Sequence, residues 1–366
     1  MLESFLHTVI YTILPAIVVF GMMIIFHELG HFLVAKLMGV QVFEFSIGFG
    51  PRIYRFVKGE TFYTLRSLPL GGFVRMAGMD AEEDNREMEK RKELCAEKGV
   101  DFDFCVDPER SFNNKGALQR IAVIAAGPLM NFVLAVFLYA IMYAYIGLPV
   151  NVIKEVSPGK PAAAAGIKPG DKVVAVNNKP VRTWEGLVDV IHNSANKKVT
   201  LTVERDNRRQ SFTVVPELDK TNKIGLIGIA PVIERPGILK SISLGTVHTY
   251  RVLALTFDFL GKMFAKQVPV ELSGPVRITM ELGKAAEMGI MPLIQLAGFL
   301  SIQIGLFNLF PIPALDGSRI IFLGIEGLRG RPVDPSKENF IHLVGLSLLL
   351  LLMVVITYKD ILHIIG

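Results

Sequence analysis

Residues 4–31 read SFLHTVIYTILPAIVVFGMMIIFHELGH, an uncharged run that leads into a His-Glu-x-x-His motif. A helix needs about 20 mostly apolar residues to cross the hydrocarbon core of a bilayer, and residues 4–26 meet that requirement. Three later runs are also uncharged and long enough, at 121–153, 288–315 and 339–358. The sequence therefore predicts a polytopic α-helical membrane protein with four transmembrane helices.

The composition of the 366 residues points the same way. Hydrophobic residues make up 51%, charged residues make up 20%, and the mean hydropathy is +0.44. A single soluble domain of this length would be less apolar. The net charge of +5 is too small to indicate nucleic-acid binding, and two cysteines are too few for a disulfide-stapled secreted domain. We therefore expect the lipid bilayer as a partner and no nucleic acid.

The His-Glu-x-x-His motif predicts a metal site. On a helix, His27 and His31 lie one turn apart on the same face, so both imidazoles can bind one ion. Glu28 lies beside that face and can reach a water molecule that the metal activates. The motif follows an apolar span, where ionisable side chains are costly and tend to be functional. A chance motif on a solvated helix is therefore the weaker interpretation.

A third ligand is needed, because catalytic zinc takes three protein ligands and keeps one open position. Asp316 follows two prolines in the run NLFPIPALDG at 308–317, which cannot form an intact helix. Such a break at membrane depth must be buried in protein or line a wet cavity. Asp316 is either the third ligand or a turn residue, since Asp-Gly is common in turns. Two imidazoles and one carboxylate suit zinc, but also iron or cobalt.

Two extramembrane regions have patterns of their own. Residues 42–76 contain β-prone stretches around the turn signal at 58–60, which predicts a β-hairpin or small sheet against the membrane. Residues 150–216 combine short alternating strands, tight turns and a short helix capped by Thr183, as in a compact α+β domain. Residues 238–290 are typical of amphipathic helices.

Basic residues near the span ends predict the orientation. The N-terminal tail lacks Lys and Arg, whereas the connection at 316–338 carries four basic residues. The positive-inside rule puts this connection and residues 39–117 in the cytoplasm, so both termini and the long segment between the second and third spans lie outside. Cys95 and Cys105 would then be cytoplasmic thiols, which stay reduced.

Short motifs spread along the chain match a known family. They are HELGH at 27–31, GFGP at 48–51, LPLGGFV at 68–74, FNNK at 112–115, AGPLMN at 126–131 and NLFPIPALDG at 308–317. Together they resemble the bacterial site-2 protease family of intramembrane zinc metalloproteases, and most closely its PDZ-containing branch that regulates sigma factors. The resemblance implies a zinc metalloendopeptidase with one catalytic Zn²⁺ ion, residing in the bacterial inner (plasma) membrane.

The resemblance also assigns roles at the metal site. It implies that Asp316 is the third zinc ligand beside His27 and His31, and that Glu28 is the catalytic base. Ser318 departs from the family, whose members usually have a second glycine after Asp-Gly. This difference concerns the backbone beyond the ligand and not the ligand itself.

Two asparagines are further candidates, as substrate-binding residues. Asn131 follows Gly127-Pro128 at the start of the second span, and Asn308 precedes the prolines. Either amide could hold an unwound substrate backbone or stabilise the developing oxyanion, and the resemblance favours substrate contact for both. Interhelical hydrogen bonds are the alternative, and the sequence does not divide the roles between the two residues.

The sequence patterns and the family resemblance together divide the chain into eight segments. They are 1–38, the first transmembrane helix with the metal motif; 39–117, the cytoplasmic β-hairpin and a charged loop; 118–148, the second transmembrane helix; 149–235, an extracytoplasmic PDZ domain; 236–290, an amphipathic helical segment; 291–318, the third transmembrane helix with the proline break; 319–338, a cytoplasmic loop; and 339–366, the fourth transmembrane helix and tail.

The implied function is regulated intramembrane proteolysis. The enzyme would cut transmembrane segments of single-pass proteins, such as anti-sigma factors and remnant signal peptides, near the cytoplasmic side after a site-1-type protease has trimmed them. The sheet at 42–76 would pair with the unwound substrate by strand addition, or would merely plug the site. Residues 224–226 would bind a chain-end carboxylate, or the PDZ domain would only exclude large substrates.

Two other functions are compatible with parts of the pattern. A non-catalytic membrane adaptor would use the PDZ domain to recruit partners, but would have lost the metal site. A metal transporter would place polar residues along several spans. Here the motif residues are all present and polar residues gather at one depth, which favours the protease.

Overall fold

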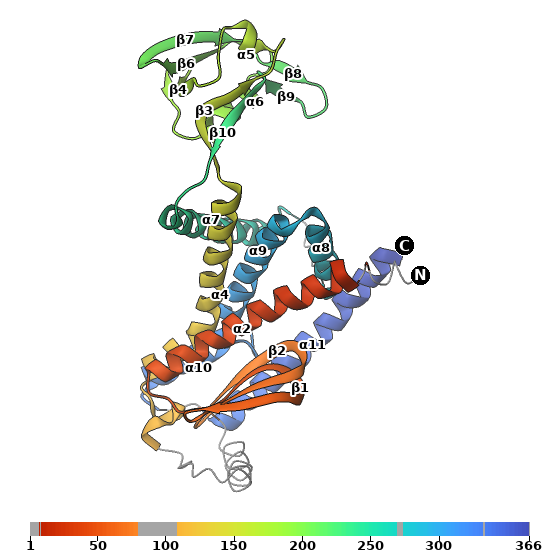
Figure 1. Ribbon diagram of the computed structural model, residues 1–366. Helices are drawn as coiled ribbons and strands as arrows, with labels where there is room; N and C mark the ends of the chain where they lie inside the picture. Colours follow the sequence, from red (N-terminus) through yellow and green to blue (C-terminus); the bar gives the residue numbers. More distant parts are fainter. Residues whose placement is uncertain (1–6, 8, 80–107, 269–273, 332–333, 366) are drawn as a thin grey trace. The chain divides into compact units, whose positions relative to one another are not determined.

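The computed structural model describes residues 7, 9–79, 108–268, 274–331 and 334–365. The chain forms two compact units. The first combines the residues up to Ala140 with those from Ile242 onward, and the second is Ile141–Ser241 (Figure 1). The charged stretch at 80–107, for which we expected a helix and loop, lies outside the described residues together with Cys95 and Cys105.

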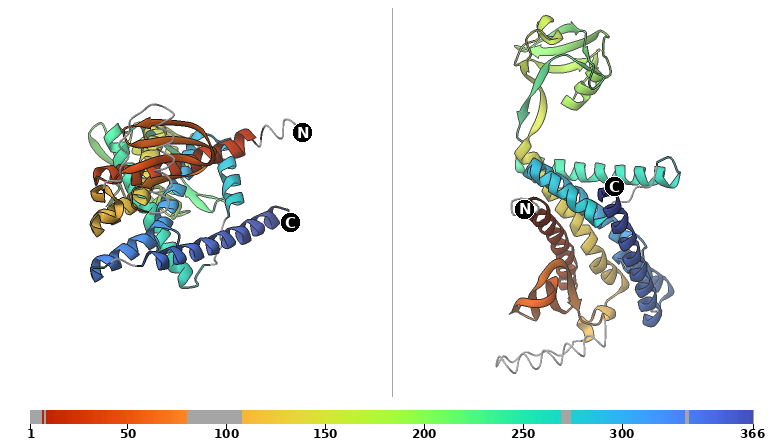
Figure 2. Two further views of the ribbon diagram at one scale, coloured as in Figure 1. Left: turned by 90° about the horizontal axis from the view of Figure 1, so that it is seen from below. Right: turned by 90° about the vertical axis from the view of Figure 1, so that its right-hand side faces the viewer.

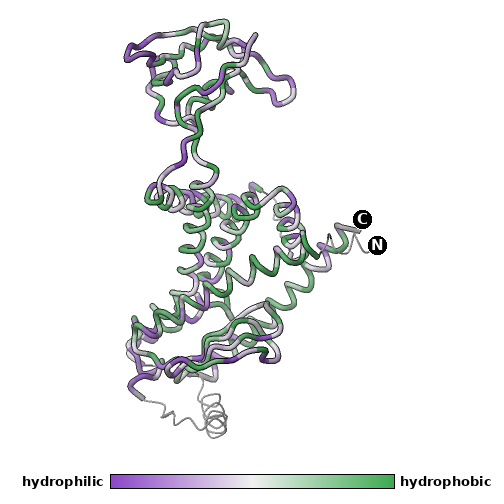
Figure 3. The backbone as a smooth tube through the Cα atoms, viewed as in Figure 1, coloured by the Kyte–Doolittle hydropathy of each residue, from purple (hydrophilic) through white to green (hydrophobic). Residues whose placement is uncertain are grey.

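Four helices are long and apolar enough to cross a membrane, which confirms the predicted number of spans within the described part of the chain. Figure 3 shows hydrophobic residues running along these helices. The helices are α2 (Leu14–Leu37), which continues from the π-helix η1 (Val9–Ile13), α4 (Ala117–Ile146), α9 (Ile290–Leu309) and α11 (Pro335–Ile365).

Small residues bring three of these helices into close contact. A Cβ atom at Gly30 of α2 would overlap the carbonyl of Ala126 in α4. A Cβ atom at Gly305 of α9 would lie 2.8 Å from the carbonyl oxygen of Pro128. Close backbone approach at small residues is how helices associate where lipid removes the hydrophobic driving force. The end of α2 that carries the metal motif is therefore held tightly against α4.

The predicted hairpin is a folded-over sheet built from β1 (Val42–Lys58) and β2 (Thr61–Met76). Residues 42–47 pair on one side with 72–76 and on the other with 62–65, while 52–58 pair with 61–66. Each of the two strands therefore contributes two segments to the sheet. This is possible because β1 bends at Gly48 and Gly50, whose φ angles are +86° and +82°. The stretch at 72–76 is left as one edge of the sheet.

The sheet is attached to the end of α2 through its turn. Glu60 forms ion pairs with Lys36 of α2 and with Arg110, at 2.7 Å for the latter. Arg110 belongs to the short helix η2 (Pro108–Arg110), which η3 (Phe112–Asn114) follows. Apolar residues of α2, β1, β2 and α4 form one buried cluster, which includes Ala35, Val42 and Val123. The sheet and the metal-motif helix therefore share a core.

The second unit is an α+β domain around one core, as predicted for residues 150–216. Thr183 caps α6 by accepting a hydrogen bond from the Gly186 N–H, and Leu187 and Leu201 are fully buried. Its sheet has the order β10-β3-β4-β6-β7, with β5 paired to β4, and a separate pair joins β8 to β9. The elements are β3 (Leu148–Val156), α5 (Pro161–Ala164), β4 (Lys172–Val176), β5 (Lys179–Pro180), α6 (Trp184–His192), β6 (Val199–Arg205), β7 (Arg208–Val214), β8 (Glu217–Asp219), β9 (Ile224–Leu226) and β10 (Ile229–Glu234).

The remaining helices follow this unit in sequence. They are α7 (Ile238–Phe264), α8 (Pro275–Met288) and α10 (Asp316–Arg329). In Figure 1 and in the right-hand view of Figure 2, α7 lies crosswise to α4 and α9. Gly245 of α7 packs on the backbone of Val136 and Ala140. An amphipathic helix in this position is suited to lie along a membrane surface.

Two expectations need correction. The segment 319–338 is not a loop, because most of it belongs to α10 and the start of α11. Leu323 is buried and Ile320 packs in the same core, which gives α10 an apolar face, and the helix ends at Gly330 in the left-handed conformation. Residues 224–226, expected to be the loop that captures a chain-end carboxylate, instead form β9 and pair with β8.

Candidate active site

The metal motif and the proline break meet at one point. The Nε2 atom of His27 lies 3.2 Å from that of His31, and the Oδ2 atom of Asp316 lies 3.1 Å from the first and 3.5 Å from the second. These three side chains form a group of possible metal ligands in the described part of the chain. The three donor atoms thus form a nearly equilateral triangle.

This triangle fits a zinc ion. Zinc binds imidazole nitrogen at about 2.0–2.1 Å in tetrahedral geometry, which spaces neighbouring donors by about 3.3–3.4 Å. The observed spacings of 3.1 to 3.5 Å lie around that value. Two imidazoles and one carboxylate leave the fourth position for water or substrate, as catalytic zinc requires. The donor set is therefore that of a catalytic and not a structural zinc site.

Contacts from α4 orient both imidazoles. Nδ1 of His31 donates a hydrogen bond of 2.9 Å to the carbonyl of Val123, which leaves Nε2 free to bind a metal. The side-chain amide of Asn131 lies 3.4 Å from Nδ1 of His27. The nearer amide atom is Nδ2, and exchanging it with the amide oxygen would place an acceptor at Nδ1 and fix the same tautomer for His27. Asn131 is fully buried, so its geometry supports orienting His27, and substrate binding by Asn131 stays a prediction.

Gly127 explains part of the AGPLMN motif. A Cβ atom at this position would overlap the Nε2 atom of His31. Only glycine therefore leaves room for the ligand nitrogen beside α4. Our sequence reasoning did not identify Gly127 as a site residue, because the contact joins helices that are distant in sequence.

The edge of the sheet covers Glu28. The contact is made at Gly72, in the edge segment 72–76. A Cβ atom at Gly72 would lie 3.2 Å from Cγ of Glu28 and 2.8 Å from the carbonyl oxygen of Ser46. The LPLGGFV motif thus brings an extended backbone to the residue proposed as the base. This contact was also outside the reach of sequence reasoning.

The proline break places Asp316 at the start of a new helix. The helix α9 ends at Leu309, and α10 begins at Asp316. A Cβ atom at Gly317 would overlap the carbonyls of Leu309 and Phe310, so the glycine after the aspartate is required by space. The hydroxyl of Ser318 donates a hydrogen bond of 2.7 Å to the Leu315 carbonyl, so a serine fits after the glycine.

Asn308 has a different environment from Asn131. Its amide nitrogen donates a hydrogen bond of 3.0 Å to the carbonyl of Ile304, one turn earlier in α9. This contact is within one helix and leaves the amide oxygen available. A role for Asn308 in substrate binding remains a prediction.

Hydrolysis of a peptide bond needs a polarised carbonyl, an activated water and a base. The metal-ligand triangle and Glu28 meet these needs within a bundle of helices that can lie in a bilayer. This combination defines a membrane-embedded metalloprotease. The adaptor hypothesis predicted a lost metal site, and the assembled ligands count against it.

Comparison with known proteins agrees with this class. The model of Peptidase family M50 matches residues 15–352. The zinc metalloprotease RasP of Geobacillus kaustophilus is 38% identical, with 96% of this chain and 97% of the relative covered. The regulator of sigma-W protease RasP of Bacillus subtilis is 36% identical, with 96% and 98% covered. The chain therefore belongs to Peptidase family M50, and the prediction of a zinc metalloprotease of the site-2 protease type is confirmed.

A solved PDZ domain also matches part of the chain. It comes from the SdrC-like protein of Listeria monocytogenes and is 22% identical, with 24% of this chain and 90% of that chain covered and a TM-score of 0.20. A score this low does not assign a fold.

Proposed function

We propose that the protein is an intramembrane protease that cuts transmembrane segments of single-pass membrane proteins, with anti-sigma factors and remnant signal peptides as its substrates. The observation that carries this proposal is the position of the metal ligands, which lie on or beside helices long and apolar enough to span a bilayer. The name of the Bacillus subtilis relative, a regulator of sigma-W protease, supports the choice of anti-sigma factors.

In the proposed reaction His27, His31 and Asp316 hold the zinc ion. When bound, zinc polarises the scissile carbonyl and makes a water molecule more acidic. Glu28 accepts the proton of the attacking water and then delivers it to the nitrogen of the leaving amine.

The sheet edge at 72–76 is the proposed substrate platform. A transmembrane helix satisfies its own backbone hydrogen bonds, so it must unwind before a carbonyl can be attacked. An exposed strand edge replaces the lost bonds by strand addition. The close approach of Gly72 to Glu28 supports this role over that of a plug, because it brings the edge to the base.

The proposed orientation has the active site near the cytoplasmic side of the bacterial inner membrane, with both termini and the second unit outside. The support is the set of basic residues around the α10–α11 connection and at the start of α4, where Arg120 pairs with Glu326 of α10. A site-1-type protease would trim each substrate first.

The second unit is proposed as a PDZ-like domain that excludes untrimmed substrates. Its compact core and its single capped helix α6 support a folded module of that kind. Capture of a chain end at residues 224–226 has lost its support, since β9 already pairs with β8. Exclusion by size needs no such loop.

The test is cleavage of a tagged single-pass model substrate by the full chain purified in detergent. Glu28→Gln should lower kcat by about 10²- to 10⁴-fold, the usual contribution of a general acid–base residue. Metal analysis should find zinc in both proteins. Zinc-loaded Glu28→Gln that cuts as fast as the wild type would refute the role of Glu28, and zinc-loaded wild type that never cuts a trimmed substrate would refute intramembrane cleavage.

A further inference from the structure

We propose that His342 of α11 is a positioning residue that holds the loop at 310–315 and thereby the Asp316 carboxylate. The backbone N–H of Ala314 donates a hydrogen bond of 3.0 Å to Nδ1 of His342. Ala314 lies two residues before Asp316, and His342 comes from a different helix. The inference rests on the proposed role of Asp316 as a zinc ligand.

The loop needs an external partner because of its own sequence. Pro311 and Pro313 have no N–H group, so they cannot donate the hydrogen bonds that would brace it. Ala314 has a φ angle of +75°, in the left-handed region that disfavours residues other than glycine. A residue stays in such a conformation only when its surroundings impose it. Inside the loop the N–H of Leu315 donates a hydrogen bond of 3.1 Å to the carbonyl of Ile312, and the hydrogen bond from Ala314 to His342 adds a constraint from another helix.

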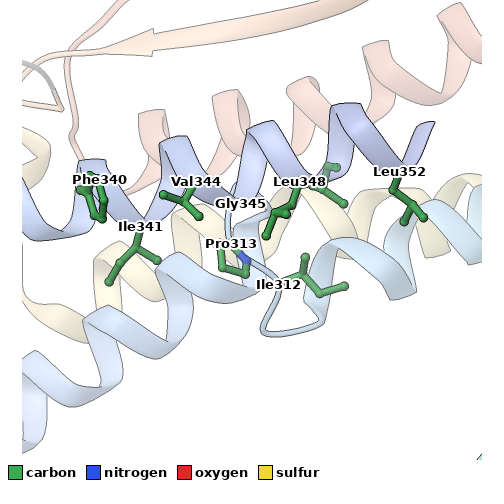
Figure 4. A pocket seen from close by; sticks show the side chains of 9 residues that line it. Ile312, Pro313, Phe340, Ile341, Val344, Gly345, Leu348 and Leu352 are labelled. Carbon is green, nitrogen blue, oxygen red and sulfur yellow. The ribbon is translucent and has the colours of Figure 1, made fainter. Parts of the chain in front are cut away.

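A second contact from the same helix acts on the same loop. Gly345 follows His342 by about one turn of α11, and a Cβ atom there would overlap the ring and backbone of Pro313. Figure 4 shows Gly345 facing Pro313, with Ile312 beside it. An apolar pocket of about 290 Å³ lies along this contact, between the loop and α11. The loop is thus pressed against α11 at Pro313 and hydrogen-bonded to it at Ala314.

The imidazole of His342 is largely buried, and its Nε2 atom makes no hydrogen bond to any described residue. Since Nδ1 accepts a hydrogen bond, the proton of the neutral ring is on Nε2, which lies 3.7 Å from Oε1 of Glu338. The ring also meets Phe322 of α10 edge-on, with centroids 6.0 Å apart. Because α10 begins at Asp316, His342 contacts the polypeptide on both sides of that residue.

The helix that supplies this contact is otherwise lightly packed. In the most apolar 18-residue stretch of α11 only 6% is buried, compared with 17–50% in the corresponding stretches of the other three candidate spans. The short face formed by His342 and Gly345 therefore couples α11 directly to the segment that carries Asp316. We expect loss of this contact to weaken zinc binding at the metal site and to leave substrate binding nearly unchanged.

The experiment compares His342→Asn with His342→Leu in the full chain purified in detergent. The Oδ1 atom of asparagine takes about the same position as Nδ1 and accepts a hydrogen bond, whereas leucine fills the space without an acceptor. His342→Leu should lower kcat by roughly ten-fold or more and speed the loss of zinc to a chelator by a similar factor, with little change in KM. His342→Asn should restore most of both quantities. His363→Leu, an exposed site on the same helix, should match the wild type.

Two further variants keep the outcomes distinct. Asp316→Asn reports on the ligand assignment alone, so zinc retention and activity in that variant would refute the proposed function and not the role of His342. Wild-type kcat and zinc retention in His342→Leu, while Asp316→Asn loses both, would overturn the present inference. If His342→Leu does not fold, Gly345→Ala decides, because the inference requires it to lose zinc faster than the wild type.

Discussion

The Nε2 atom of His27 lies 3.1 Å from the Oδ2 atom of Asp316. The first residue belongs to the first candidate span, and the second follows the proline break after the third. Neither residue can form the site alone, and the contact exists only because α9 ends at Leu309 and a new helix starts at Asp316. The carboxylate is therefore the ligand whose removal tests the whole arrangement.

We predict that Asp316→Asn lowers zinc affinity by more than the 10- to 100-fold typical of residues that merely support a ligand. A neutral amide is a poor substitute for a carboxylate on a divalent cation. Metal content after dialysis against a chelator measures the effect. Asp258→Asn, at a residue whose side chain is 58% exposed, is the control and should keep its zinc. Equal zinc content in the two variants would contradict the assignment.

The sequence predicted the local half of this site well. His27, Glu28 and His31 follow from helical spacing, and the prolines before Asp316 showed that the third span had to break. The contacts of Gly127 with His31 and of Gly72 with Glu28 were not predictable, because they depend on how distant segments pack. The same is true of the sheet, where pairing of residues 42–47 on both sides is a matter of tertiary register. Hydrophobic packing on the sheet core likewise made a helix of α10 in the segment that we expected to be a cytoplasmic loop.

We predict that Gly127→Ala damages the metal site, although alanine favours helices. The new methyl group would overlap the Nε2 atom of His31, so the imidazole must leave its position. Zinc retention and kcat should both fall by at least ten-fold, as for loss of a group that orients a ligand. The matched control is Gly261→Ala in α7, where nothing lies within 4 Å of the added atom.

In the control, greater helix propensity alone should raise stability by up to about 1 kcal/mol. Chelator competition and thermal unfolding distinguish the two variants. If Gly127→Ala retains zinc as well as Gly261→Ala does, the close contact between Gly127 and His31 is not needed for zinc binding.

A buried carboxylate holds the sheet together. Glu44 has no exposed surface and lies 3.1 Å from Arg66 and 3.7 Å from Arg75. Removing one partner of a buried pair leaves uncompensated charge, which costs about 3–5 kcal/mol. We therefore predict that Glu44→Gln greatly increases hydrogen exchange across residues 42–76 and lowers activity, since the edge beside Glu28 belongs to the same sheet.

The control for Glu44→Gln is Glu281→Gln. Glu281 pairs with Lys284 on an exposed surface, where such pairs contribute about 1 kcal/mol or less. Exchange across 42–76 should be unchanged in that variant. Wild-type protection of the sheet in Glu44→Gln would show that the arginines find other partners.

The second unit has an ion pair that makes its stability depend on pH. Arg205 donates two hydrogen bonds of 2.7 Å to the carboxylate of Asp171, which is 1% exposed, and the Lys168 N–H donates another of 2.9 Å. Burial raises the pKa of Asp171, but these hydrogen bonds lower it by more, so the pKa lies below the ordinary aspartate value. The pair therefore stabilises the fold fully above about pH 4, and its contribution is lost as the pH falls through the folded-state pKa.

We predict that Asp171→Asn costs about 2–3 kcal/mol at neutral pH, below the full cost of breaking a buried pair because Arg205 is partly exposed. The midpoint of thermal unfolding should drop by on the order of 10 °C for a unit of this size. Trp184 is the only tryptophan and lies in the core of this unit, so its fluorescence in the full chain reports on this unit directly. Glu217→Gln, which breaks the exposed pair with Lys160, should change the midpoint little. The gap between wild type and Asp171→Asn should narrow from about pH 4 downward and close as the pH falls through the depressed folded-state pKa, where the native carboxylate becomes protonated. A gap that stays constant down to pH 2 would contradict this linkage.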